Sequence, residues 1–480
     1  MPKPDVTLPL ADAASSFVVL HLGLGSFHRA HQAVYMQQLI DKGDALWSIS
    51  GANLRPDMAE VLDALRAQDG CYVVETASPA GEYVYQRIES IREVLPYEPT
   101  LAAVMARGAA ETTRIISFTV TEAGYYLDAK NRLDVSFPDV SQDIERVKKS
   151  EAGSTIYAAI TGILRARREA NAGPVTLLNC DNLRHNGERF RSGLLEFIGL
   201  AGDPVLLDWV REHTTCPNAM VDRITPRPPA ELRERVRQAT GLDDAAAVTA
   251  ESFIQWVIED DFIAGRPDWE SVGVQLVDSV APYEEAKIRL LNASHSCIAW
   301  AGTLIGLQFI HEGTHTPAIH KRAFDYVTDD VIPCLNASGA PSPVDLPAYR
   351  DVVLERFGNP AIRDTNQRVA MDGFSKIPGF IAPTVRERLA RNESIDSVAM
   401  LPALFLAFLQ RWHRGEVPYT YQDQNMDVAA AHAMCEAGDP VAVFCADVGL
   451  WGDLAGDARL TDAVRRAEAR VSAFVASAQP

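Results

Sequence analysis

Three side chains that could carry out acid–base chemistry lie close together in residues 283–296, YEEAKIRLLNASHS. At about 100° per residue, a helix there would place Lys287, His295 and Asn292 at roughly 0°, 80° and 140°, an arc that can face one cleft. Such residues are often only the solvated face of a helix. Here the neighbouring residues are largely apolar, which indicates a buried helix. Polar side chains on a buried helix normally have hydrogen-bond partners or a function.

Removal of a hydride from an alcohol is one chemistry that these residues fit. The reaction needs a base for the hydroxyl proton and donors that stabilise the alkoxide-like oxygen. A lysine, with an ordinary pKa of about 10.4, can act as this base when a desolvated pocket lowers its pKa. Asparagine amides can donate without carrying charge. Asn182, just after an expected strand at 174–179, is a second candidate donor, although a turn or helix cap would also explain it.

A glycine pair follows the first expected strand, 17–22, in the segment GLGSFHRAHQ at 23–32. Gly23 and Gly25 at such a turn would let the backbone approach a pyrophosphate, which a helix N-terminus then binds. His28 replaces the third glycine of the usual fingerprint, and a tight turn alone would also favour glycine. The position after the first strand of a βα region favours a dinucleotide site.

The residues that follow the expected strands at 45–51 and 114–120 indicate whether the cofactor is NAD or NADP and how a proton could leave the site. Asp57, beyond the expected strand at 45–51, could bind a ribose diol and select NAD. It could equally cap a helix, and Arg55 could instead accept a 2′-phosphate. NAD is the predicted cofactor. Glu122 follows the strand at 114–120, and together with Glu284 it could hold water or relay the lysine's proton.

Residues 311–315, HEGTH, match the HExxH pattern of zinc proteases. Gly313 and the Thr-His-Thr-Pro that follows it predict a helix end, and the spacing of a third ligand is not found. The seven cysteines are scattered without a CxxC pair, which favours reduced thiols. We therefore predict no metal site.

Composition narrows the class of protein. The 480 residues include 45 basic and 64 acidic side chains, a net charge of −19, which disfavours nucleic acid and anionic membranes as partners. The 47% apolar fraction is that of a soluble globular protein. The sequence contains no run of 18 apolar residues and no signal segment at its start. These features predict a cytoplasmic enzyme.

The pattern of expected secondary structure changes near residue 280. Before it, short apolar runs alternate with helical stretches, as in a buried parallel sheet. After it, helical patterns dominate. We predict an α/β fold with a Rossmann-type dinucleotide-binding domain at residues 1–281, followed by a mostly α-helical substrate domain at 282–480.

Several segments resemble the polyol-specific long-chain dehydrogenases, the mannitol dehydrogenase family. They are residues 23–32, TEAGYY at 121–126, NCDN at 179–182, PNAMVDRITP at 217–226, residues 283–296 and DGFSKIP at 372–378. The resemblance implies a Rossmann-type domain, a helical domain and a metal-free active site between them.

By this resemblance, Lys287 is the general base, Asn182 and Asn292 form the oxyanion hole, and His295 positions the substrate. The residues that line the polyol pocket would be Asp222, Arg368 and Lys376. The residues that bind the cofactor would be Gly23, Gly25, Phe27, Arg29, Asp57 and Glu122.

The expected activity is NAD-dependent oxidation of a polyol to a 2-ketose. D-arabinitol to D-xylulose is the first expectation, and D-mannitol to D-fructose is the alternative. A third possibility is an NAD-binding sensor without catalysis, although a sensor need not keep Lys287, Asn182, Asn292 and His295 together. We expect a monomer, in line with the family and the acidic surface.

Overall fold

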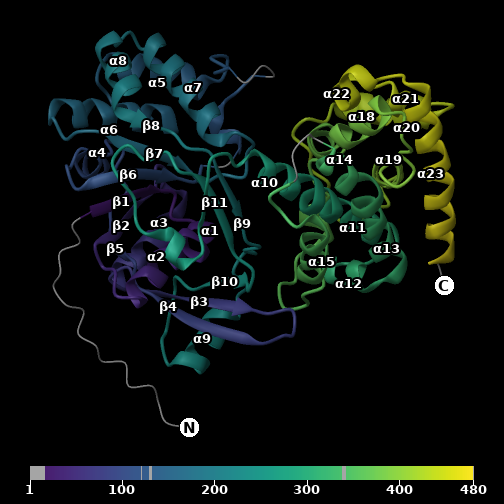
Figure 1. The fold of residues 1–480 in the computed structure, drawn as a ribbon, viewed down its shortest axis with the longest axis horizontal. Coiled ribbons are helices and arrows are strands. Elements are labelled where there is room, and N and C mark those ends of the chain that lie inside the picture. Colours follow the sequence, from purple (N-terminus) through teal and green to yellow (C-terminus); the bar gives the residue numbers. More distant parts are fainter. Residues whose placement is uncertain (1–16, 121, 129–131, 338–341, 479–480) are drawn as a thin grey trace. The chain divides into compact units, whose positions relative to one another are not determined.

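The computed structural model describes residues 17–120, 122–128, 132–337 and 342–478. The chain forms two compact units (Figure 1). Unit 1 holds the residues up to Thr76 together with Val84–Val280, and unit 2 holds Ala77–Tyr83 and Ala281–Pro480. Unit 1 contains a parallel sheet covered by helices, and unit 2 is mainly helical, so the predicted fold class is confirmed.

The central sheet of unit 1 has six strands in the order β5-β2-β1-β6-β7-β8. They are β1 (Phe17–Leu22), β2 (Trp47–Ala52), β5 (Ile91–Val94), β6 (Thr113–Phe118), β7 (Val175–Asn179) and β8 (Thr214–Thr215). All neighbouring strands pair in parallel. Because β1 lies between β2 and β6, the connections diverge at β1. Such a switch point, at the carboxyl ends of the strands, is where open α/β sheets bind ligands.

Alternating residues of β1 explain why helices cover both faces of this sheet. Leu20 and Leu22 belong to one buried cluster, while Val19 belongs to another. Successive side chains of a strand point to opposite faces, so each face needs its own cover. The helices of unit 1 are α1 (Ser26–Ala30), α2 (Gln32–Asp41), α3 (Ala59–Ala67), α4 (Ala102–Gly108), α5 (Pro138–Lys148), α6 (Ile156–Glu169), α7 (Asn186–Leu200), α8 (Pro204–His213) and α9 (Leu232–Thr240).

Two smaller sheets complete unit 1. One has the order β10-β3-β4 and the other β12-β11-β9. Their strands are β3 (Tyr72–Ala77), β4 (Tyr83–Ile88), β9 (Ala219–Asp222), β10 (Val248–Glu251), β11 (Gln255–Glu259) and β12 (Gln275–Val277). The connection between β3 and β4 belongs to unit 2, where Asn359 Nδ2 donates to Ala77 O at 3.0 Å.

Unit 2 is built around α11, which is buried along nearly its whole length and contacts α12, α13, α16 and α19. Its helices are α10 (Ala281–Ala286), α11 (Ala293–Leu304), α12 (Ile310–His315), α13 (Pro317–Asp325), α14 (Ile332–Asn336), α15 (Leu346–Phe357), α16 (Asn366–Ala370), α17 (Gly373–Lys376), α18 (Ala382–Ala390), α19 (Met400–His413), α20 (Val428–Glu436), α21 (Pro440–Cys445), α22 (Val448–Trp451) and α23 (Ala458–Ser477).

The segment that joins α10 to α11 is a π-helical turn, η4 (Lys287–Asn292). The expectation of a regular helix at 100° per residue is therefore wrong across this turn. A π turn bonds each residue to the fifth one along, so that its side chains are displaced from their α-helical positions.

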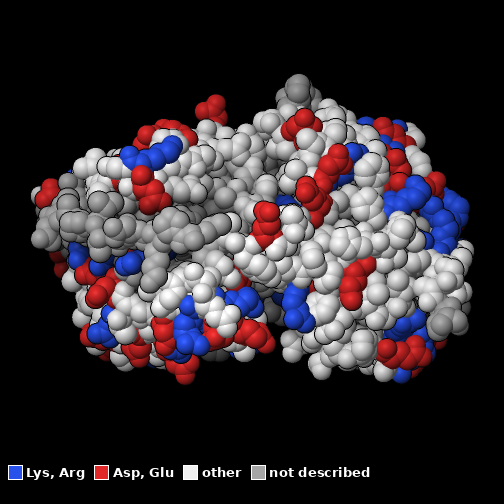
Figure 2. All heavy atoms as spheres, turned by 90° about the horizontal axis from the view of Figure 1, so that it is seen from below, with Lys and Arg blue, Asp and Glu red and all other residues white. Residues whose placement is uncertain are grey.

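Acidic and basic side chains are interspersed on the face drawn in Figure 2. Among the ion pairs of the described residues, Arg266 pairs with both Asp260 and Glu270. Within the described part of the chain, none of the helices combines the length and the apolar character that crossing a membrane would need.

Candidate active site

The turn after β1 requires glycine at its first position. Gly23 has a φ of +114°, and a Cβ there would lie 2.3 Å from the carbonyl oxygen of Thr119. Two groups bind the Gly23 carbonyl: Thr119 Oγ1 donates to it at 3.0 Å and His21 Nε2 lies 3.1 Å away. Gly25 caps α1, and a Cβ there would meet only the Gly23 oxygen, at 4.0 Å. The turn is thus held rigidly while its outer side stays open.

His28 explains how the chain manages without the third glycine of the fingerprint. That glycine normally allows close packing of helix against strand. Here the His28 ring stacks on His21 of β1 with centroids 3.4 Å apart and planes 14° apart. Burial lowers the pKa of His21 to about 3 and that of His28 well below its usual value, so both rings are neutral. Two flat, uncharged rings therefore replace the missing close contact.

The other predicted cofactor residues lie in different surroundings. Phe27 stacks on His31, with centroids 5.0 Å apart. Arg29 is 2% exposed and its guanidinium donates to the Ala246 carbonyl, which gives it a structural role beneath the turn. Asp57 is exposed in the short helix η1 (Pro56–Met58), beyond the carboxyl end of β2. Glu122 begins the short helix η2 (Glu122–Tyr125), and its side chain lies outside the described part of the structure.

These features of unit 1 fit a dinucleotide. The open glycine turn lies at the switch point of the sheet, and an acid follows the neighbouring strand. Asn53, the residue after β2, accepts from Leu24 N at 2.7 Å through Oδ1. Its Nδ2 is buried with no hydrogen-bond partner among the described residues. A donor left without a partner in this position is available to a bound ligand.

The loop after β7 is anchored by Asp181. Its carboxylate accepts from Val120 N at 3.0 Å and from the Tyr125 hydroxyl at 2.7 Å. Asn182 follows directly and is exposed, so a fixed backbone carries the predicted amide donor. Asp222 ends β9 and is 4% exposed. Unit 1 therefore supplies Asn182 and Asp222.

Unit 2 supplies the remaining predicted residues. Lys287 begins η4 and is 6% exposed, and Asn292 ends the same turn. Between them, Arg289 donates to Glu285 at 2.7 Å and to both oxygens of Glu387 at 2.6 and 2.9 Å. Burial disfavours the charged guanidinium, but these carboxylates outweigh it and raise the pKa of Arg289. The η4 turn is thereby tied to α18.

Two further predicted side chains, those of His295 and Arg368, contact the carboxylate of Asp364. His295 Nε2 lies 3.2 Å from Asp364 Oδ2, and Arg368 Nε donates to Oδ1 at 2.6 Å. Burial favours a raised pKa for Asp364, but the nearby His295 and the hydrogen bonds from Arg368 outweigh it and hold this pKa below its usual range. Burial lowers the pKa of His295, against the opposing effect of Asp364. His295 Nε2 makes no hydrogen bond to the described residues, so its approach to Asp364 is an electrostatic contact. A neutral His295 keeps one ring nitrogen as an acceptor.

Two further contacts fix this cluster. The His295 ring stacks on Phe357 of α15, with centroids 4.4 Å apart. Lys376 Nζ donates to the Val369 carbonyl at 2.5 Å. The sequence reasoning missed Asp364, although its spacing of four residues to Arg368 is one at which opposite charges pair on a helix. The structure thus brings His295 and Arg368 together at a carboxylate that was not predicted, and Lys376 lies close enough to His295 to act on it electrostatically.

The HExxH match has a structural explanation. Glu312 Oε2 accepts from Gln308 N at 2.9 Å and from Phe309 N at 2.8 Å, so this carboxylate caps α12. The helix ends at His315. The described residues contain no group of three His, Cys, Asp or Glu side chains that could bind a metal ion.

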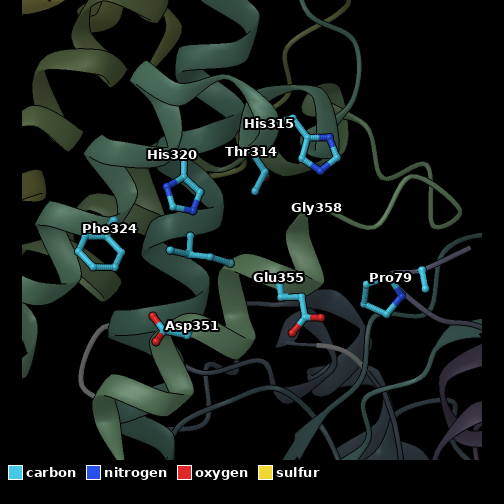
Figure 3. A pocket seen from close by; sticks show the side chains of 10 residues that line it. Pro79, Thr314, His315, His320, Phe324, Asp351, Glu355 and Gly358 are labelled. Carbon is cyan, nitrogen blue, oxygen red and sulfur yellow. The ribbon is translucent and has the colours of Figure 1, made fainter.

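A cavity of about 580 Å³ lies in unit 2 (Figure 3). It is lined by Pro79, Ala80, Thr314, His315, His320, Phe324, Asp351, Leu354, Glu355 and Gly358. None of the predicted site residues lines it.

Models of two domains match the chain: the mannitol dehydrogenase Rossmann domain over residues 18–271 and the mannitol dehydrogenase C-terminal domain over 279–472. The D-arabinitol 4-dehydrogenase of Ralstonia nicotianae is 57% identical over 463 residues, covering 96% of this chain and 97% of the relative. That of Klebsiella pneumoniae is 54% identical, covering 96% and 99%.

Solved structures agree with these matches. The Pseudomonas fluorescens mannitol 2-dehydrogenase ternary complex with NAD and D-mannitol is 34% identical with a TM-score of 0.83, covering 97% of this chain and 94% of that one. A substrate-free D-sorbitol dehydrogenase is 32% identical with a TM-score of 0.85, covering 97% and 98%. The chain is therefore a polyol dehydrogenase of the mannitol dehydrogenase family.

Proposed function

We propose that this chain oxidises D-arabinitol to D-xylulose with NAD. The observation that carries the proposal is the 57% and 54% identity to two D-arabinitol 4-dehydrogenases over nearly the whole chain. The mannitol 2-dehydrogenase of Cereibacter sphaeroides is 37% identical, a much weaker likeness. The proposal keeps the sequence predictions of a cytoplasmic monomer.

In this proposal residues 1–281 bind the cofactor and 282–480 bind most of the polyol. The Gly23–Gly25 turn would bind the pyrophosphate, and Asp57 would bind the adenosine ribose. When bound, NAD supplies the hydride acceptor. The choice of NAD is supported by the family's Rossmann domain and by a family structure solved with NAD.

The side chains of the two units then have distinct tasks. Lys287 takes the hydroxyl proton, and the amides of Asn182 and Asn292 donate to the oxygen as its charge develops. His295 accepts from a second polyol hydroxyl through a ring nitrogen, with its ring stacked on Phe357 and close to Asp364. The further polyol contacts come from Asp222, Arg368 and Lys376. Glu284, which is buried in α10 three residues before Lys287, and Glu122 pass the lysine's proton outward.

D-mannitol is the second candidate substrate, because a family structure contains it. A panel of D-arabinitol, D-mannitol and D-sorbitol, each with NAD and with NADP, separates the candidates by the absorbance of the reduced cofactor. We expect kcat/KM to be highest for D-arabinitol with NAD. Faster turnover of D-mannitol would replace the substrate assignment. NAD binding without turnover of any polyol would identify a sensor.

Replacing either oxyanion donor should reduce turnover. Asn292→Ala and Asn182→Ala are each expected to lower kcat by about 10²-fold, the usual effect of removing one such donor. Asn336→Ala, at an exposed position at the end of α14, is the matched control and should keep the wild-type kcat. Initial rates at saturating NAD make the comparison. Wild-type turnover in either site variant would remove that amide from the mechanism.

The glycine turn gives a separate test of the cofactor site. Gly23→Ala forces a side chain into a left-handed backbone and against Thr119, so we expect the Kd for NAD to rise at least about tenfold. Gly43→Ala has a similar φ of +95° but open space around its Cβ, and should leave the Kd unchanged. Isothermal titration of both variants measures this. Equal affinities in the two variants would argue against the turn as the pyrophosphate site.

A further inference from the structure

Within the described residues, three π-helical turns occur, all in unit 2: η4, η5 (Tyr326–Val331) and η6 (Ile377–Ile381). Each one continues an α-helix on both sides. The η4 turn contacts both η5 and η6. Such turns normally make up well under 1% of residues and occur frequently at functional sites. Three such turns, with η4 in contact with the other two, therefore need an explanation.

The η4 turn changes which predicted residues share a face. On an α-helix, Lys287 and Asn292 would be about 140° apart. In a π turn the hydrogen bond joins residues five apart, so these two become neighbours, as residues four apart are on an α-helix. The extra residue thus brings the predicted base and an amide donor onto one side of the helix.

Proline explains the irregularity of the other two turns but not of η4. Pro378 lies within η6, and Pro333 follows η5 closely; neither has an N–H for the helical ladder. The residues of η4, KIRLLN, include no proline. Contacts from outside the helix must therefore favour the π form of η4.

Tyr326, the first residue of η5, provides such a contact. Its hydroxyl donates to the main-chain carbonyl of Arg289, in the middle of η4, at 3.0 Å. Tyr326 is fully buried, so water cannot replace this bond. The side chain of Arg289 is bound on another side by Glu387. The turn is thus held through its backbone by Tyr326 and through its side chain by Glu387.

We propose that Tyr326 is a positioning residue for the oxidation, which keeps η4 in the π form so that Lys287 and Asn292 act on the same alcohol. The proposal rests on the role of Lys287 given under the proposed function. Tyr326 itself touches neither substrate nor cofactor in this account. Its effect is confined to the chemical step.

The test compares two substitutions that each remove one buried or half-buried hydroxyl from unit 2. Tyr326→Phe removes the bond to η4. Tyr419→Phe is the matched control. It removes a hydrogen bond of 2.7 Å to the Thr303 hydroxyl, which belongs to a side chain and not to the backbone of η4. For Tyr326→Phe we expect kcat for D-arabinitol to fall about tenfold, the Kd for NAD to stay unchanged and the pH profile of kcat to shift. Tyr419→Phe should keep kcat and the pH profile.

Equal kcat and equal pH profiles in the two variants would overturn the proposal, and so would a loss in Tyr326→Phe that appears only in the Kd for NAD. If Tyr326→Phe does not fold, Glu387→Gln replaces it as the probe, because it weakens the second support of η4 at unchanged volume. A lower kcat with unchanged NAD affinity then supports the proposal, and an unchanged kcat overturns it.

Lys287→Ala separates this inference from the proposed function. If Lys287→Ala is inactive while Tyr326→Phe is fully active, only the role of Tyr326 fails. If Lys287→Ala retains wild-type turnover, the base assignment itself is wrong.

Discussion

Lys287→Ala is expected to lower kcat for D-arabinitol oxidation by about 10³- to 10⁴-fold, the upper range for loss of a general base. Lys287 begins the η4 turn and is almost completely buried, which suits a group that must accept a proton. NAD binding should persist, because the glycine turn lies in unit 1. Lys321→Ala, which removes an exposed lysine paired with Asp325, is the matched control and should retain wild-type turnover.

The pH dependence of the oxidation rate in Lys287→Ala tests whether Lys287 is the general base. Lys287 must be neutral to take a proton, so wild-type polyol oxidation should rise with pH along one ionisation. Ketose reduction needs the protonated lysine and should weaken over the same range. The variant should lose this ionisation, and small primary amines should partly restore its rate. Near wild-type oxidation with the same ionisation would show that another residue is the base.

Arg167→Ala is expected to lower the free energy of unfolding by about 4 kcal/mol or more. Arg167 is fully buried in α6, and its guanidinium donates to the main-chain carbonyls of Gly108, Ala110, Ala172, Gly173 and Pro174. These carbonyls belong to the segments that lead into β6 and β7. Removing the donors leaves the buried carbonyls of Gly108 and Ala172 and three half-buried ones without this partner and opens a cavity, and each change costs free energy.

Urea unfolding followed by circular dichroism measures this loss. Arg167→Met keeps most of the apolar volume and should lose nearly as much stability as Arg167→Ala, because the hydrogen bonds are the main contribution. Arg237→Ala, which breaks an exposed pair with Glu234, should leave the free energy of unfolding close to that of the wild type. An Arg167→Met protein as stable as the wild type would assign the role of Arg167 to packing alone.

The central sheet could be predicted from the sequence because its strands are buried on both faces. The apolar runs at 17–22, 45–51, 114–120 and 174–179 correspond to β1, β2, β6 and β7, with ends displaced by up to two residues. The small strands were not predicted. Strand β4, with the sequence YVYQRI, is an example. Most of its residues are exposed or half-buried, so its sequence lacks the continuous apolar run that predicts a buried strand.

Candidate site residues could be chosen from the sequence where they lie close together along the chain. Lys287, Asn292 and His295 were chosen this way, and their roles stay predictions. The π form of η4 could not be predicted this way, because it depends on Tyr326 and Glu387, which come from distant segments. Asp364 was missed for the same reason: its contact with His295 joins α11 to the residue before the cap of α16.

The most direct measurement of the central claim is the turnover of D-arabinitol by the purified protein with NAD, with the product identified. The account predicts NADH and D-xylulose in equal amounts, at a kcat/KM above that for D-mannitol, and loss of both products in Lys287→Ala. Formation of D-ribulose, a higher kcat/KM for D-mannitol or an absence of NADH would contradict it.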